Sequence, residues 1–157
     1  MKLKDKVALI TGGAKGIGFG CAKIFAKHGA SVVIADRDET AGKAAAAQLA
    51  AAGHLAEFVR CDVTSETDLA AVVDFVIQRF RRLDCLVNNA GWHPPAMTID
   101  QTTVEDFERL VRLNLTSTFM GCKFAVPHLR KTRGSIINMS SEVALIGQAA
   151  APSYVAT

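Results

Sequence analysis

A glycine-rich turn near the amino end has the residue types that bind a phosphate group through the backbone. Gly12, Gly16 and Gly18 follow the apolar run 7–10 and precede residues with a helical pattern. A strand, a glycine turn and a helix in this order point backbone N–H groups and a helix N-terminus at an anion. Glycines also let the backbone approach a pyrophosphate, because they carry no Cβ and tolerate positive φ. The spacing is not the common G-x-G-x-x-G, so the turn alone is weak evidence for a phosphate site.

An acidic residue at the end of the next strand extends this site to a dinucleotide. The β-like run 31–36 ends in Asp36, eighteen positions after Gly18, where a carboxylate can bond the adenosine ribose hydroxyls. Lys15 and Arg37 are basic groups that could instead bind a 2′-phosphate, or could be solvated surface charges. A carboxylate on the ribose leaves little room for that phosphate. We therefore expect NAD as the cofactor and disfavour NADP.

Five short apolar runs with strand character are separated by helical segments. They lie at 7–10, 31–36, 56–61, 85–88 and 135–139. Strands that alternate with helices form a parallel sheet whose right-handed crossovers cover both faces. The predicted fold class is α/β, a Rossmann-like doubly wound parallel sheet of five strands in the order 3-2-1-4-5. No linker or repeat divides the chain, so we expect one domain over 1–157.

Four helices are predicted from apolar periodicity and from capping signals. The first places five residues on one face, Ile17, Cys21, Ile24, Phe25 and His28. The second is the alanine-rich stretch 39–52, and the third is an amphipathic stripe over 69–80. The fourth begins at a capping box formed by Thr102 and Glu105 and continues to about Leu129.

Composition and charge favour some classes of protein over others. Half of the 157 residues are hydrophobic, 21% are charged and the formal net charge is +3, which is typical of a globular domain. Acids and bases are interspersed, which favours a solvated mixed surface over a nucleic-acid interface. The four cysteines contain no C-x-x-C pair, so we expect buried, reduced thiols and no metal site. With no signal peptide and no membrane-length apolar run, we expect a soluble cytoplasmic protein.

Five motifs in register resemble those of the short-chain dehydrogenases/reductases. They are the turn 11–18, the pair Asp62-Val63, the run 88–91, Asn114, and Ser141 thirteen residues before Tyr154. The resemblance covers essentially the whole chain. It implies a cofactor site made by Gly12, Lys15, Gly16, Ile17, Gly18, Asp36, Arg37, Asp62, Val63, Asn89, Ala90 and Gly91.

The same resemblance implies three catalytic residues. Tyr154 would act as the acid or base that moves a proton on the substrate oxygen. Ser141 would hydrogen-bond that oxygen as charge develops, and Asn114 could hold a water in a proton relay. Taken singly, Asn114 could be an ordinary bonded polar residue, Ser141 a turn residue and Tyr154 a surface aromatic. In this register we favour the catalytic interpretation of all three.

Trp92 and His93, which follow the run 88–91, are candidates for the substrate side of the site. His93 could line the substrate pocket or be a structural or solvated histidine, and Trp92 could be a pocket wall or an interface residue. The stretches 83–85, 88–95, 146–149 and 154–157 resemble the branch of the family that contains 17β-hydroxysteroid dehydrogenase type 14. That branch implies NAD-linked oxidation of a small secondary alcohol, or the reverse reduction of a ketone, with hydroxysteroids and L-fucose-like sugars among its substrates. It also implies a homo-oligomer for the full-length form.

The family's catalytic pattern continues from the tyrosine to a lysine four residues later. In this sequence that position lies one residue after Thr157. In the family the lysine bonds the nicotinamide ribose and makes the tyrosine more acidic, so we expect the 157-residue chain to be impaired. It could be a piece of an ordinary enzyme, a truncated inactive product, or an NAD-binding or interaction module. A Rossmann methyltransferase is disfavoured, because it explains neither the run 88–91 nor the spacing of Ser141 and Tyr154.

Overall fold

Five parallel strands form one sheet in the order β3-β2-β1-β4-β5, which confirms the predicted topology. The computed structural model describes all residues 1–157. The strands are β1 (Val7–Thr11), β2 (Ser31–Asp36), β3 (Ala56–Arg60), β4 (Cys85–Asn88) and β5 (Ser135–Asn138). Each lies within one residue of its predicted bounds, because each is a compact apolar run between polar segments.

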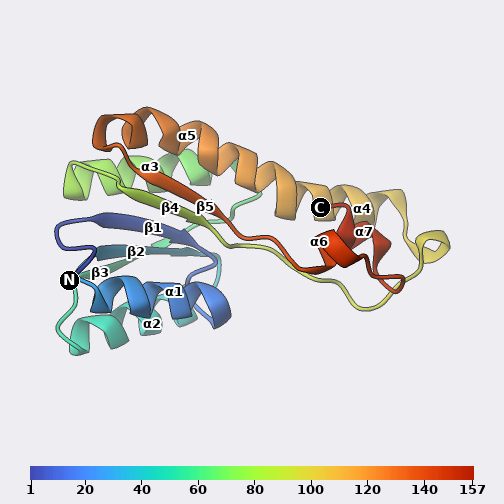
Figure 1. Ribbon diagram of the computed structural model, residues 1–157, viewed down its shortest axis with the longest axis horizontal. Coiled ribbons are helices and arrows are strands. Elements are labelled where there is room, and N and C mark those ends of the chain that lie inside the picture. Colours follow the sequence, from blue (N-terminus) through green and yellow to red (C-terminus); the bar gives the residue numbers. More distant parts are fainter.

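Helices cover both faces of the sheet (Figure 1). The longer ones are α1 (Gly16–Lys27), α2 (Glu39–Ala51), α3 (Glu66–Phe80), α4 (Val104–Leu110) and α5 (Ser117–Thr132). Short helices α6 (Val143–Ile146) and α7 (Pro152–Val155) lie near the carboxyl end. In Figure 1, α1 and α2 lie against one face of the sheet, and α3 and α5 lie against the other. The predicted α/β layers are therefore present.

The buried face of α1 differs in part from the face that the sequence suggests. Ile17 and Ile24 belong to the expected apolar face, yet they are 68% and 54% exposed. The buried positions are Gly18, Ala22 and Ala26, one turn apart along the helix. Small side chains let α1 approach the sheet closely. The apolar pattern therefore located this helix correctly. Cys21 and Phe25 of the expected face pack partly buried against the core, whereas Ile17 and Ile24 do not.

The long fourth helix begins one residue later than predicted and contains a π-helical segment. The cap is Thr103, whose side chain accepts a hydrogen bond from the backbone N–H of Asp106, so the predicted capping box at Thr102 is wrong. Between α4 and α5 lies the π-helical segment η2 (Val111–Thr116). A π-helical turn widens the helix locally and often occurs at functional sites. It carries the predicted site residue Asn114.

The α4–α5 helix extends beyond the sheet, and the chain around α6 and α7 packs beside that extension (Figure 1). We call this part, residues 92–110 and 139–157, the projecting region. Its two segments are joined by a backbone hydrogen bond from the Met97 N–H to the Ala150 carbonyl, 2.7 Å long. The Ser153 hydroxyl also donates to the Thr102 hydroxyl over 3.2 Å. These contacts bring the loop after β4 against the segment that contains Tyr154.

All four cysteines are free, but only Cys61 is buried, so the expectation of four buried thiols is wrong for the other three. Cys21, Cys85 and Cys122 are half-buried. None of the helices combines the length and the apolar character that crossing a bilayer requires.

Candidate active site

The glycine turn after β1 is held by side chains from the end of β4. The Asn89 side-chain amide donates to the carbonyls of Thr11 and Gly12, over 3.0 and 3.1 Å. The Thr11 hydroxyl in turn accepts the backbone N–H groups of Asn89 and Ala90. These four bonds fix the turn relative to the neighbouring strand.

The turn has the backbone geometry that only glycine adopts easily. Gly12 and Gly16 have φ of +61° and +55°, in the left-handed region. A Cβ on Gly12 would lie 2.9 Å from the Cα of Ala90, and one on Gly18 would lie 2.2 Å from the Gly12 carbonyl oxygen. The turn is therefore closed against β4 on one side while its other side remains open, as a cradle for a phosphate requires.

Asp36 links the turn to the end of β2. One carboxylate oxygen accepts from the Ala14 N–H over 3.1 Å, and the other accepts from the Asp38 N–H over 3.0 Å. Lys15 forms a 2.7 Å ion pair with Asp38, and the hydrogen bond to Asp38 is the main reason that the pKa of Lys15 is raised. The ammonium group nearest the turn is thus already partnered by a carboxylate.

The predicted cofactor residues surround one cavity of about 420 Å³. Eleven of the twelve line it, namely Gly12, Lys15, Gly16, Ile17, Asp36, Arg37, Asp62, Val63, Asn89, Ala90 and Gly91. Gly18 is the exception, because it is buried beneath the turn against Gly12. Residues from four different strand ends thus meet at the carboxyl edge of the parallel sheet, where α/β folds bind nucleotides.

Cys61 and Asp62, which follow β3, form the far wall of this cavity. One carboxylate oxygen of Asp62 accepts the backbone N–H and the hydroxyl of Thr64, and these bonds lower the pKa of Asp62, the backbone N–H contributing most. Burial raises the pKa of the Cys61 thiol to about 12. Near neutral pH this wall therefore presents an ionised carboxylate and a neutral thiol.

The predicted catalytic residues line a second cavity of about 240 Å³ that adjoins the first. Asn114, Ser141 and Tyr154 all border it, and so does the predicted substrate residue His93. The two cavities share Ile17 and the segment 89–92. The arrangement therefore places the three candidate catalytic side chains at one end of the candidate nucleotide cavity.

Asn114 clamps the loop that divides the two cavities. Its side-chain oxygen accepts the Trp92 N–H over 2.9 Å, and its amide nitrogen donates to the Trp92 carbonyl over 3.1 Å. The same nitrogen donates to the Thr157 hydroxyl. Both N–H donors of this amide are therefore committed to protein partners, and the side chain positions Trp92. The amide oxygen accepts one bond and retains a second lone pair that could accept from a water.

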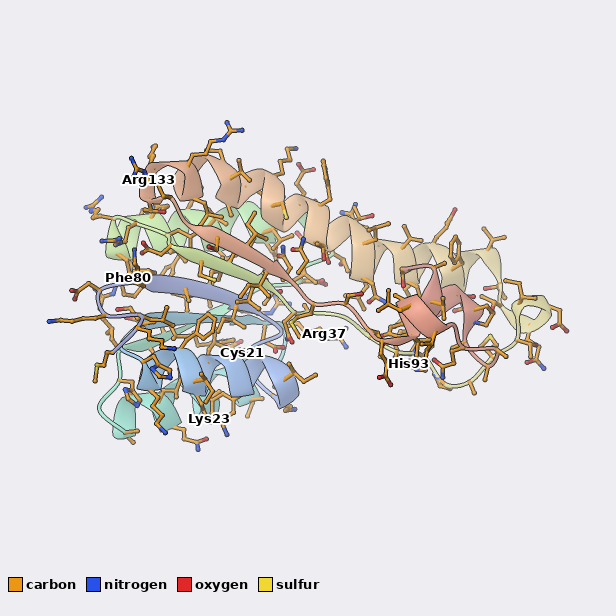
Figure 2. All side chains as sticks on the ribbon, in the orientation of Figure 1. Cys21, Lys23, Arg37, Phe80, His93 and Arg133 are labelled. Atoms are coloured by element: carbon orange, nitrogen blue, oxygen red, sulfur yellow. The ribbon has the colours of Figure 1, made fainter.

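Tyr154 lies against His93, with ring centroids 4.4 Å apart and planes inclined at 54°. The two ring nitrogens of His93 lie 2.6 Å from the Pro94 carbonyl oxygen and 3.1 Å from the side-chain oxygen of Gln148. Figure 2 labels His93 in the projecting region, away from the sheet. The Ser141 hydroxyl accepts the Val143 N–H over 3.4 Å, and because it acts there as an acceptor, its own proton remains available to donate.

Some residues of the site carry no signal in the sequence. Gln148 meets His93 across 55 positions of chain, and no spacing rule links the two. The role of Thr11 could have been inferred, since a hydroxyl that closes a strand beside a glycine turn commonly bonds nearby backbone groups. Trp92 matters through its backbone, which a side-chain motif does not reveal.

Together, the parallel sheet, the glycine turn and the paired cavities are typical of α/β proteins that bind dinucleotides. The sequence comparison identifies the family. The family described as short chain dehydrogenase matches residues 6–157, and the chain belongs to it. The family takes its name from dehydrogenases, which in general use nicotinamide cofactors.

Relatives with curated descriptions include dehydrogenases of two kinds. L-fucose dehydrogenase of Oryctolagus cuniculus is 48% identical over 152 residues, covering 97% of this chain and 52% of that protein. 3-beta-hydroxysteroid dehydrogenase of Comamonas testosteroni is 43% identical over 140 residues, covering 89% of this chain and 54% of that protein. The chain thus spans about half the length of these curated relatives.

A solved structure supports the fold. The crystal structure of gox2181 superposes with a TM-score of 0.95 at 30% identity, covering 99% of this chain and 62% of that chain. The strand order and the flanking helices are therefore those of a known Rossmann-like protein.

Proposed function

We propose that the chain supplies the cofactor site and the proton-transferring residues of an NAD-linked dehydrogenase for small secondary alcohols or ketones. The observation that carries this proposal is the pair of adjoining cavities, one lined by the nucleotide residues and the other by Ser141 and Tyr154. The L-fucose and 3β-hydroxysteroid dehydrogenases among the relatives support a ring alcohol as the substrate class.

NAD fits this site better than NADP does. Asp36 presents a carboxylate to the cavity, which favours ribose hydroxyls and repels a 2′-phosphate. Lys15, which could otherwise neutralise such a phosphate, is paired with Asp38. The glycine turn would hold the pyrophosphate, and Val63 and Asp62 would contact the adenine end.

Two hydroxyl groups, those of Tyr154 and Ser141, act on the substrate oxygen. When bound, the nicotinamide ring accepts hydride from the carbinol carbon or returns it to the carbonyl carbon. The Tyr154 phenol takes the proton from the alcohol oxygen, or gives it back during reduction. The Ser141 hydroxyl donates a hydrogen bond to that oxygen and keeps it oriented as charge develops. Asn114 acts indirectly as a positioning residue, because it holds Trp92 between the two cavities.

The remaining expectations accompany this proposal. The enzyme would be cytoplasmic, would act on small molecules without nucleic-acid or membrane partners, and would form a homo-oligomer in a full-length form. The 157-residue chain would bind cofactor but turn over slowly. Light scattering on the chain and on a longer polypeptide of the same protein measures the assembly state directly.

Calorimetric titration with NAD and NADP, followed by oxidation assays on L-fucose and a 3β-hydroxysteroid, tests the proposal. We expect NAD to bind more tightly than NADP, and the preference to fall about tenfold or more in Asp36→Ala through loss of the charge-assisted bonds to ribose. Tyr154→Phe should retain NAD affinity while abolishing oxidation. Asp74→Asn, a change of the same charge on the exposed face of α3, is the control for both assays.

The outcomes separate the alternatives. An unchanged preference in Asp36→Ala would show that the cofactor assignment is wrong. Specific NAD binding without oxidation by either the 157-residue chain or a longer polypeptide would favour a binding module over an enzyme. Undiminished oxidation by Tyr154→Phe would show that Tyr154 is not the general acid and base.

A further inference from the structure

A third cavity continues from the cofactor cavity past Asp62, and its walls are cationic. Its volume is about 490 Å³, and its charged residues are Arg37, Arg109, Arg112 and Asp62. The two cavities share Arg37, Asp62, Trp92 and Leu113, whereas Arg109 and Arg112 border the third cavity alone. The proposed dinucleotide function assigns no role to these last two arginines.

None of the three arginines has a carboxylate partner within ion-pair distance. Glu105 and Glu108 lie one helical turn before Arg109 and Arg112, yet they pair with neither. Glu66, whose charge reaches Arg112, is instead bonded by Lys123 over 2.8 Å. Asp62 contributes the only carboxylate of the lining, and one of its oxygens is committed to Thr64. The lining therefore carries a net charge of two positive units.

Two of these guanidinium groups are held in place by contacts that leave their charge uncompensated. Arg112 donates from Nε and Nη2 to a single acceptor, the Thr64 carbonyl oxygen. Arg109 lies over the Trp92 ring, with its guanidinium carbon 5.3 Å from the ring centroid. A guanidinium has five N–H donors, so Arg112 retains three, and Arg109 and Arg37 use none on protein acceptors. Oriented and unpaired donors of this kind match the oxygens of a phosphate group.

We propose that this cavity is an anion subsite that binds a phosphate group, either as inorganic phosphate or as a phosphate monoester, separate from the cofactor's own phosphates. An anion here compensates the net positive charge of the lining and accepts from the unused N–H donors of its arginines. The cofactor's pyrophosphate belongs at the glycine turn, which does not border this cavity. Arg37, labelled in Figure 2 near the carboxyl end of the sheet, is the residue common to both sites.

The intrinsic fluorescence of Trp92 reports on this cavity directly. Trp92 is the only tryptophan of the chain, and Arg109 stacks on its ring. An anion that draws Arg109 toward itself changes this stacking and therefore the emission. Titrating the chain, without cofactor, with inorganic phosphate and with ribose 5-phosphate should give saturable changes that sodium chloride at equal ionic strength does not reproduce.

Matched variants decide where the anion binds. Arg109→Gln combined with Arg112→Gln should weaken phosphate binding at least about tenfold, because charge-assisted donors are lost. Arg130→Gln combined with Lys131→Gln removes the same charge from the far end of the long helix and should leave affinity unchanged. Thermal unfolding of each variant verifies that it is folded.

Each result bears on the proposal. Tighter binding of ribose 5-phosphate identifies a monoester ligand, whereas equal binding identifies free phosphate. The proposal is overturned if chloride reproduces the signal, if the arginine pair can be replaced without loss, or if no saturable signal appears. It is also overturned if Lys15→Gln alone abolishes binding, since the anion then occupies the glycine turn.

Discussion

Strands β1 and β5 lie two positions apart in the same sheet, yet their surroundings differ completely. Every residue of β1 is buried, whereas no residue of β5 is buried and Ile137 is 41% exposed. The glycine turn continues from β1, and the segment bearing Ser141 continues from β5. The proposed nucleotide end of the site therefore rests on packed core, and the proposed reaction end rests on an exposed strand and the projecting region.

The two ends are also held by different numbers and kinds of contacts. The glycine turn is held by backbone pairing of β1 and by several partly buried hydrogen bonds of Thr11 and Asn89. The proposed reaction end is held by side-chain contacts such as Asn114 to Trp92, and its two segments are joined by contacts such as Met97 to Ala150 and Ser153 to Thr102. Segments with few buried contacts open at low free energy. By this measure we expect the proposed cofactor end to be the more rigid of the two.

Gly18→Ala should have the largest effect on stability and on NAD binding, because Gly18 packs against the glycine turn at the rigid end. The added Cβ would lie 2.2 Å from the Gly12 carbonyl oxygen, and backbone there cannot move without distorting the turn. We expect a loss of about 3 kcal/mol in the free energy of unfolding, together with loss of NAD binding. Urea unfolding and calorimetry measure both.

Gly20→Ala is the matched control on the same helix. A Cβ there meets nothing within 4 Å, so the substitution should stabilise the chain by about 0.5–1 kcal/mol through helix propensity. Equal effects of the two substitutions would contradict the close approach of α1 to the turn.

Asp84→Asn tests the opposite, amino-terminal edge of the same rigid sheet. The buried carboxylate accepts the Val7 N–H and binds Lys6 and Arg82. Burial alone would raise the pKa of Asp84, but these bonds hold it below its ordinary value. We expect a loss of about 2 kcal/mol on urea unfolding. The control Asp74→Asn should change the free energy of unfolding by no more than about 0.5 kcal/mol. If it caused a similar loss, removal of a negative charge, and not loss of the buried contacts of Asp84, would explain the effect.

Ser153→Ala tests a buried polar contact in the projecting region. Ser153 is only 5% exposed, but its hydroxyl meets one partner, Thr102, at the surface of the region. The expected loss is about 0.5 kcal/mol in global stability, with faster hydrogen exchange of the Met97 N–H. If the loss matched that of Asp84→Asn, the two ends would be equally rigid and the comparison would fail.

The rigid end is also the part that the sequence predicts best. Apolar runs such as 31–36 specify strands, and parallel topology then brings Gly12, Asp36, Asp62 and Asn89 to one edge. The core face of α1 was predicted only in part, because Gly18, Ala22 and Ala26 carry little hydrophobic signal, although only small residues allow the close packing. Local pattern identifies an element more readily than the surface on which it packs.

The reaction end is harder to predict, because its contacts join positions far apart. Asn114 binding Trp92, His93 meeting Gln148, and Arg112 reaching Thr64 all depend on the path of the long helix. No periodicity marks the π-helical segment that carries Asn114. The family resemblance named several of these residues, but their partners follow only from the fold.

The smallest predicted effect is a pH dependence at the far wall of the cofactor cavity. Hydrogen bonds from Thr64, the backbone N–H first, lower the pKa of Asp62. The ionised carboxylate therefore contributes stability above the ordinary carboxyl pKa of about 4, and this contribution is lost as pH falls. Asp62→Asn should give a flatter decline in urea-unfolding free energy between about pH 5 and pH 3. Thr64→Val keeps the backbone donor and loses the hydroxyl, so its slope should lie between those of wild type and Asp62→Asn. An identical acid slope in all three chains would mean that this turn contributes nothing to the acid sensitivity of the fold.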